Sequence, residues 1–167
     1  MNEEIVNDIA SNQKQDEEKI EVQNKITWLI FSINEKKYAI KSSEVHEIIR
    51  DLTVYKLPFL PSYIEGVINR RGDPFTVINP LSIIDSMEAP PPESSLFLIL
   101  KRTDDQVSLH ISDILSFYDV EENDIHLIPN GENEGLYLGT IEYNKEEIPA
   151  LNSEAFELIL RKDFGAA

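Results

Sequence analysis

The chain has 167 residues, which is enough for one domain or for two small subdomains that share a core. Its 31 acidic residues outnumber its 15 lysines and arginines, and the resulting net charge of −16 disfavours binding to nucleic acid or to anionic membranes. The absence of cysteine excludes disulfides, thiol catalysis and cysteine-based zinc sites. Because the amino terminus lacks the basic and apolar stretches of a secretory signal, and no segment is long and apolar enough to cross a bilayer, we expect a cytoplasmic protein.

The first segment is acidic and poor in apolar residues. Residues 1–25 contain scattered aliphatic side chains among acids and lysines, a composition that cannot bury enough surface to offset the entropy of ordering. We therefore predict a flexible acidic tail. The alternative is a short docking helix that uses Ile5, Val6 and Ile9.

From residue 26 onward the chain consists of short aromatic and β-branched runs separated by polar turns, which is typical of strands and hairpins. Residues 26–33 and 38–40 are predicted to pair as a hairpin. Residues 43–49 begin with serine and have apolar side chains at helical spacing, so they predict one or two helical turns. Residues 53–57 are predicted to form a strand.

A second hairpin is predicted where residues 66–69 and 75–78 flank a turn that contains Gly72. The proline-rich segment 89–95 then divides the folded part into two halves, because consecutive prolines donate no ladder hydrogen bonds. Near the carboxyl end, residues 153–160 predict a helix with a serine cap and an acidic first turn.

The two halves resemble each other. At an offset of 69 residues, Trp28 to Phe31 align with Phe97 to Leu100, and the next strand and the serine after it also align. At an offset of 73 residues, Gly66 to Ile68 align with Gly139 to Ile141. The same order of elements occurs twice, which indicates an internal duplication.

The sequence contains no residue pattern that is typical of a metal site or a catalytic site. The acidic stretch from Asp119 to Asp124 lacks the glycine and the final glutamate of a calcium loop, and no two histidines have metal-binding spacing. His110, Ser112 and Asp113 include the residue types of a hydrolytic triad, but neighbours on one strand point in different directions. We predict no metal, no cofactor and no enzymatic activity.

The feature that remains is a pair of arginines at the tip of the second predicted hairpin. Arg70 and Arg71 stand out in a chain dominated by acids. They either solubilise an exposed turn or use the planar guanidinium fork to hold a carboxylate or backbone carbonyls, within the domain or across an interface.

At these residues the chain resembles the CheW-like family of chemotaxis coupling proteins. The resemblance covers the chain from about residue 26 to the terminal helix, and it is carried by residues 38–40, 45–50, 57–58, 61–72 and 77–79. It implies a mostly β fold with two intertwined five-stranded SH3-like barrels, short helices and a C-terminal helix. We place the first barrel at about 26–88, the second at about 95–152 and the helix at about 153–162, with the chain free to cross between barrels.

The same resemblance implies a non-enzymatic adaptor that couples the cytoplasmic tip of a chemoreceptor to the regulatory domain of a CheA-type sensor histidine kinase. The residues expected to bind the receptor are Val45, Ile48, Ile49 and Arg71. Those expected to bind the kinase are Gly66, Ile68, Asn69, Arg70, Gly72 and Val77. An apolar groove that accepts an amphipathic helix is a common mode of peptide recognition.

Five residues at three places depart from the family pattern. Arg70 replaces an aliphatic residue, and Asp73-Pro74 and Asn79-Pro80 also differ, so the partners could be specialised ones. A rival interpretation is a barrel that binds a small ligand, with Trp28, Tyr38 and Phe97 lining its cavity. A second rival is a weak hydrolase that uses Ser112 or the acids near Asp119.

Overall fold

The computed structural model describes residues 24–101, 106–128 and 135–164. The predicted tail, including Ile5, Val6 and Ile9, lies outside the described residues up to position 23. The strands are β1 (Lys25–Ile33), β2 (Lys36–Lys41), β3 (Val45–Arg50), β4 (Ile64–Arg70), β5 (Asp73–Ile78), β6 (Leu96–Leu100), β7 (Val107–Ile111), β8 (Asp113–Glu121), β9 (His126–Leu127), β10 (Tyr137–Tyr143) and β11 (Glu146–Leu151). The helical elements are the 3-10 turns η1 (Ser42–Glu44) and η2 (Glu122–Asp124) and the α-helices α2 (Pro80–Ile84) and α3 (Ser153–Phe164).

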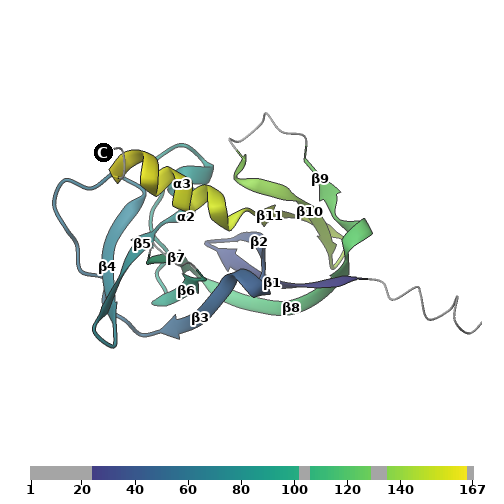
Figure 1. Cartoon of the computed structure of the whole chain (residues 1–167), viewed down its shortest axis with the longest axis horizontal. Helices are drawn as coiled ribbons and strands as arrows, with labels where there is room; N and C mark the ends of the chain where they lie inside the picture. Colours follow the sequence, from purple (N-terminus) through teal and green to yellow (C-terminus); the bar gives the residue numbers. More distant parts are fainter. Residues whose placement is uncertain (1–23, 102–105, 129–134, 165–167) are drawn as a thin grey trace, which may run out of the picture.

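The strands form two sheets, and each sheet takes strands from both halves of the chain. Sheet A has six strands in the order β8-β1-β2-β11-β10-β9, and sheet B has five in the order β3-β6-β7-β5-β4. In Figure 1 sheet B lies on the left and sheet A on the right, and α3 runs from near the middle to the upper left. Residues 26–88 and 95–152 therefore do not form one sheet each, because the chain crosses between the sheets.

The crossing follows one rule in both halves. The first hairpin of each half (β1–β2 or β6–β7) joins the sheet that otherwise consists of strands from the other half. Each exchanged hairpin pairs antiparallel on one side, β1 with β8 and β6 with β3, and parallel on the other side, β2 with β11 and β7 with β5. The expected mostly β, intertwined fold with a C-terminal helix is confirmed. The barrels are not closed, because both sheets have open strand orders, and sheet A has a sixth strand, the two-residue β9.

The core has one shared part and two private parts. Leu29 and Phe31 of sheet A and Leu98 and Leu109 of sheet B belong to one large buried cluster, which Phe156 of α3 completes. Because side chains alternate along each strand, the other face of each sheet packs into a smaller cluster, which we call its private core. The private core of sheet A includes Trp28 and Ile141, and that of sheet B includes Ile68 and Phe97. Each sheet therefore curls around a private core while its back packs on the other sheet.

The repeat is visible in individual hydrogen bonds. The N–H of Asn79 donates to Tyr63 O at 2.8 Å, and the N–H of Asn152 donates to Leu136 O at 2.7 Å. The Asn79 side chain accepts from Leu81 N and the Asn152 side chain accepts from Glu154 N, each at 3.2 Å, so each asparagine caps the helix that follows its hairpin. The cap of α3 is therefore Asn152, and the predicted cap Ser153 is the first residue of the helix. These matched contacts support the predicted duplication.

Two predicted elements are wrong. Residues 43–49 do not form a helix, because η1 ends at Glu44 and the chain then continues as strand β3. The apolar spacing fits either element over so few residues, and β6 supplies backbone partners for a strand that contains Val45, Ile48 and Ile49. The strand predicted at 53–57 is reduced to a single bridge between Tyr55 and Val67. Among the described helices, none is long and apolar enough to span a membrane.

Candidate functional site

All ten residues predicted to bind partners lie in sheet B or in its β4–β5 turn. Val45, Ile48 and Ile49 lie on the edge strand β3. The other seven lie along the β4–β5 hairpin or at its turn, and they are Gly66, Ile68, Asn69, Arg70, Arg71, Gly72 and Val77. The two groups occupy opposite edges of the strand order, which the curl of the sheet brings towards each other.

Three of these side chains face the private core of sheet B. Ile68 and Val77 are 0% exposed and Ile49 is 8% exposed, and they pack with Phe97 and Ile99. A buried aliphatic side chain supports a surface from beneath, so these three side chains do not reach a partner while the packing is intact. Val45 and Ile48 are half-buried against the shared core and keep part of their surface open.

The hairpin turn is ordered by its own sequence. Arg71 and Gly72 have φ values of 51° and 90°, the left-handed pair that a two-residue hairpin turn requires. The N–H of Gly72 donates to Asn69 Oδ1 at 2.8 Å, so the Asn69 side chain braces the turn. The turn therefore presents Arg71 at a defined position at the end of sheet B.

Arg70 is engaged inside the domain. Its Nε donates to Glu47 Oε2 at 3.1 Å, and its Nη2 donates to Glu47 Oε1, which makes a two-pronged ion pair. Arg70 and Ile68 are two residues apart and share a face of β4, so the pair lies over the open end of the private core. The hydrogen bond from Arg70 lowers the pKa of the Glu47 carboxyl, and the same bond raises the pKa of Arg70. This ion pair joins the edge strands β3 and β4.

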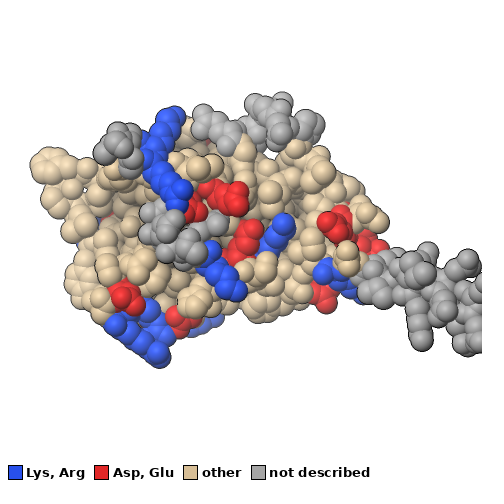
Figure 2. Space-filling view, viewed as in Figure 1, with Lys and Arg blue, Asp and Glu red and all other residues tan. Residues whose placement is uncertain are grey.

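Arg71 differs from its neighbour. It is exposed, and within the described parts of the chain no ion pair is formed by it. Basic side chains gather at lower left in Figure 2, where the β4–β5 hairpin lies, although the chain as a whole is strongly acidic. A guanidinium at this position can bind a carboxylate of a partner.

Gly66 is required by a close backbone approach. A Cβ at this position would lie 2.2 Å from Tyr55 O, and its φ of 148° is one that other residues rarely adopt. The segment that contains Tyr55 crosses β4 here, with hydrogen bonds between Tyr55 and Val67 of 2.8 and 2.9 Å. Gly66 therefore allows the segment around Tyr55 to pair with the edge strand β4, and it has no side chain with which to bind a partner.

Sheet B also contains a buried polar cluster that the sequence did not predict. His110 Nδ1 lies 2.8 Å from Glu65 Oε2, and His110 Nε2 lies 2.5 Å from Ser94 O. Both ring nitrogens therefore lie against oxygen atoms of the domain. The ring stacks on Phe97 at 4.7 Å. No spacing rule could pair His110 with Glu65, because they are 45 residues apart.

The rival functions lose their motivating observations. Trp28, Tyr38 and Phe97 are at most 3% exposed and belong to three different core clusters, so they do not line one common cavity. The Ser112 hydroxyl accepts from Asn34 N at 2.7 Å, whereas the His110 ring contacts Glu65 and Ser94, so the supposed triad does not converge. In the described segments no group of three or more His, Asp or Glu side chains is arranged to hold a metal ion.

Comparison with known proteins identifies similar chains. A family model described as "CheW-like domain" matches residues 27–156. The chain is 25% identical to the "Chemotaxis protein CheW" of Helicobacter pylori over 158 residues, covering 93% of this chain and 90% of that protein. It is also 25% identical to the "Chemotaxis protein CheW" of Bacillus subtilis over 135 residues, covering 81% of this chain and 86% of that protein.

A solved structure shows the same fold. The crystal structure of scaffolding protein TtCheW from Thermoanaerobacter tengcongensis matches with a TM-score of 0.69 at 22% identity, covering 77% of this chain and 90% of that chain. The family match spans both sheets and the start of the terminal helix. The chain therefore belongs to the CheW-like family.

Proposed function

We propose that this protein is a non-enzymatic cytoplasmic adaptor that couples the cytoplasmic tip of a chemoreceptor to the regulatory domain of a CheA-type histidine kinase. It transmits the state of the receptor by binding alone, without a cofactor, without nucleic acid and without insertion into the membrane. Membership of the CheW-like family and the names of its relatives support this proposal.

The observation that carries the proposal is the contrast between Arg70 and Arg71. Arg70 forms an ion pair with Glu47 inside the domain. Arg71 is an exposed cation on the turn that the Asn69 side chain braces, at the end of sheet B. The braced backbone presents the Arg71 side chain at the end of sheet B, where its guanidinium can bind a carboxylate of a partner through two hydrogen bonds.

The receptor surface in this proposal consists of β3 and the hairpin turn. Val45 and Ile48 offer half-buried apolar surface for a helix, Ile49 supports them from the core, and Arg71 adds the charge. The kinase would bind along the β4–β5 hairpin. There Asn69 and Gly72 shape the exposed turn, Arg70 keeps it joined to β3, and the remaining members Gly66, Ile68 and Val77 maintain the strand from within.

Direct binding assays test the adaptor function. The full chain, immobilised through its carboxyl end, is exposed separately to a receptor-tip fragment and to a kinase regulatory domain from the same organism. We expect both to be retained, and both together when they are mixed. Retention of neither partner would contradict the proposal.

Charge reversal at the turn tests the site. Arg71→Glu should weaken the binding of the receptor-tip fragment by roughly tenfold or more, because the substitution replaces a group that binds carboxylates by one that repels them. Arg70→Glu should weaken binding less, since Arg70 acts within the domain. The matched control is Asn144→Glu, because Asn144 has the corresponding place in the β10–β11 turn, with a φ of 50°. Calorimetric titration measures the three affinities, and circular dichroism confirms folding. Equal losses for Arg71→Glu and Asn144→Glu would rule out a specific role for Arg71.

A further inference from the structure

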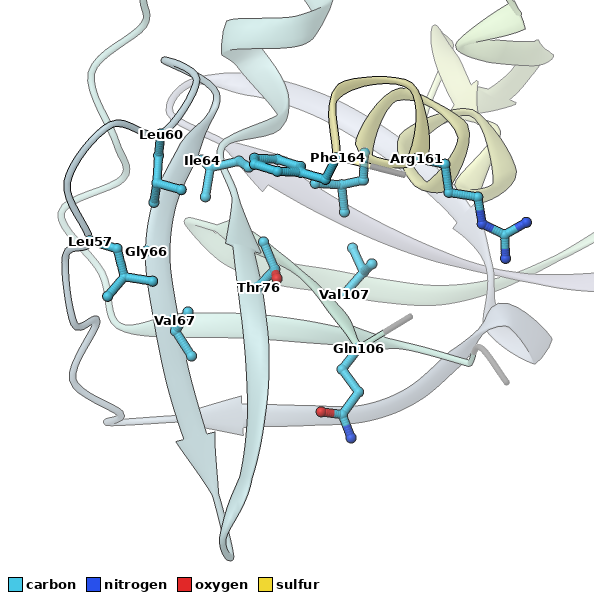
Figure 3. Close-up of a pocket in the computed structure, with 11 residues that line it drawn as sticks. Leu57, Leu60, Ile64, Gly66, Val67, Thr76, Gln106, Val107, Arg161 and Phe164 are labelled. Carbon is cyan, nitrogen blue, oxygen red and sulfur yellow. The ribbon is translucent and has the colours of Figure 1, made fainter. Parts of the chain in front are cut away.

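A pocket of about 420 Å³ lies at the open end of the private core of sheet A. The aliphatic residues that line it are Ile26, Ile125, Leu127 and Leu138. Figure 1 shows β9 and β10 at the right, on the far side of the molecule from the β4–β5 hairpin. The pocket in Figure 3 is a different one, because it lies between sheet B and α3 and is lined by Gly66 of that hairpin. The described residues that line the sheet A pocket include none of those assigned to the receptor or the kinase.

The corresponding place in sheet B is filled by side chains of the protein itself. His110 stacks on Phe97 at 4.7 Å, and the Glu65 carboxylate lies 2.8 Å from His110 Nδ1. The same antiparallel register pairs Phe97 with His110 in sheet B and Trp28 with Lys41 in sheet A. Trp28 and Lys41 both line the sheet A pocket, so the repeat places the pocket where sheet B holds its polar pair.

In sheet A a leucine replaces the carboxylate of that pair. Leu138 corresponds to Glu65, because each residue occupies a register shift and precedes a glycine that packs against a backbone carbonyl. Lys41 supplies a cation at the position of His110, and within the described ranges its ammonium group forms no ion pair. Sheet A therefore keeps a basic side chain at this place and lacks the acid that faces it in sheet B.

Trp28 adds a hydrogen-bond donor to the same pocket. Its side chain is 0% exposed, and in the part of the chain that the structure describes its Nε1 has no hydrogen-bond acceptor. A buried N–H without an acceptor is destabilising, so a ligand that brings an acceptor to the indole is favoured. The pocket thus combines aliphatic walls, one cation and one unpaired donor.

We propose that this pocket binds a small monocarboxylate with an aliphatic body, whose carboxylate takes the place that Glu65 holds in sheet B. The carboxylate pairs with Lys41 and accepts from Trp28 Nε1, and the aliphatic body packs against Ile125 and Leu138. A volume of about 420 Å³ is typical of sites for small molecules. The inference does not depend on the adaptor function.

A titration followed by nuclear magnetic resonance tests the site, with octanoate as the probe and the full-length isotope-labelled chain. Trp28 is the only tryptophan, so its indole N–H gives one signal that reports on the pocket. We expect a saturable shift of this signal and of the amide signals of Ile125 and Leu138, and none for Val67 and Val107 beside the pocket in Figure 3. An indole signal that does not shift, or shifts confined to Val67 and Val107, would overturn the proposal.

Charge variants test the role of the rim. Lys41→Met should weaken octanoate binding about fivefold or more and leave the binding of uncharged 1-octanol unchanged, because only octanoate pairs with the ammonium group. Glu122 is exposed on the same rim and repels an anion, so Glu122→Gln should strengthen octanoate binding by roughly twofold. The matched control is Lys101→Met, which removes an exposed lysine after β6. Equal losses for Lys41→Met and Lys101→Met would rule out a specific role for Lys41.

A transplanted carboxylate tests the correspondence between the two sheets. Leu138→Glu places the acid of sheet B in sheet A, where it should pair with Lys41 and weaken octanoate binding about tenfold or more. Leu138 is half-buried, so circular dichroism must confirm that the variant folds. Unchanged octanoate affinity in the folded Leu138→Glu protein would contradict the proposal, and Lys41→Met decides the question if that variant does not fold.

Discussion

The open ends of the two sheets are related by the repeat, but they are joined by different chemistry. In sheet B, Arg70 of β4 forms an ion pair with Glu47 of β3. In sheet A, the position that corresponds to Arg70 is Tyr143, and its ring meets Tyr118 of β8 at 5.3 Å in an edge-on contact. One end is therefore tied by charge and the other by an aromatic pair.

The interiors beneath these ends differ in the same direction. Where sheet B has His110 and Glu65, the repeat places Lys41 and Leu138 in sheet A, and the leucine cannot form the corresponding side-chain hydrogen bond. The two sheets share backbone pairing, turn positions and helix caps. They differ in the side chains at these interior positions, where sheet B has a hydrogen-bonded polar pair. A duplicated framework can thus keep its backbone contacts while its side chains diverge, which provides the unlike surfaces that an adaptor needs.

The largest expected effect comes from the feature that both sheets retain. Gly66→Ala should lower the free energy of unfolding by about 3 kcal/mol or more, because the new Cβ would lie 2.2 Å from Tyr55 O and the residue would keep a φ of 148°. Gly139→Ala would place its Cβ 2.2 Å from His126 O but without the strained φ, so its loss should be smaller. Urea denaturation measures both. A larger loss for Gly139→Ala would contradict the role assigned to backbone strain at Gly66.

The second effect tests the polar interior of sheet B. Glu65→Leu and His110→Leu should each cost about 2 to 3 kcal/mol, because each leaves a buried polar partner without its hydrogen bond. The double variant should cost less than the sum of the two single variants, by about 1 kcal/mol or more. Lys41→Leu in sheet A is the matched control and should change stability by less than about 0.5 kcal/mol. Strict additivity in denaturation experiments would show that the two side chains do not act as a pair.

The smallest effect concerns the ion pair at the end of sheet B. Arg70 lowers the pKa of Glu47 below its ordinary value of 4.5, so the folded state binds the proton less tightly than the unfolded state does. The stabilisation is therefore full above pH 4.5 and disappears as the pH falls through the lowered pKa of Glu47. Arg70→Met should reduce the unfolding midpoint slightly at neutral pH, and the difference from the unchanged protein should shrink below pH 4.5. A difference that does not change with pH would exclude the Glu47 pair as its cause.

The sequence by itself determined the local elements that have strong signals. Gly72 has the positive φ that a two-residue turn favours, and the hairpin forms where predicted. The offsets of the repeat likewise identified Gly66 and Gly139 as equivalent before any contact was known. The resemblance to the family also indicated two intertwined β subdomains and a terminal helix.

Only the tertiary structure decided how these elements combine. The segment 45–49 became a strand because β6 offers it backbone partners, which no local pattern reports. The exchange of the β1–β2 and β6–β7 hairpins between sheets, and the assignment of Glu47 to Arg70 instead of Arg71, depend on contacts between residues far apart in the chain. Turn signals are local because they reflect the φ and ψ preferences of single residues, whereas strand partners and ion pairs are chosen by burial of the whole core.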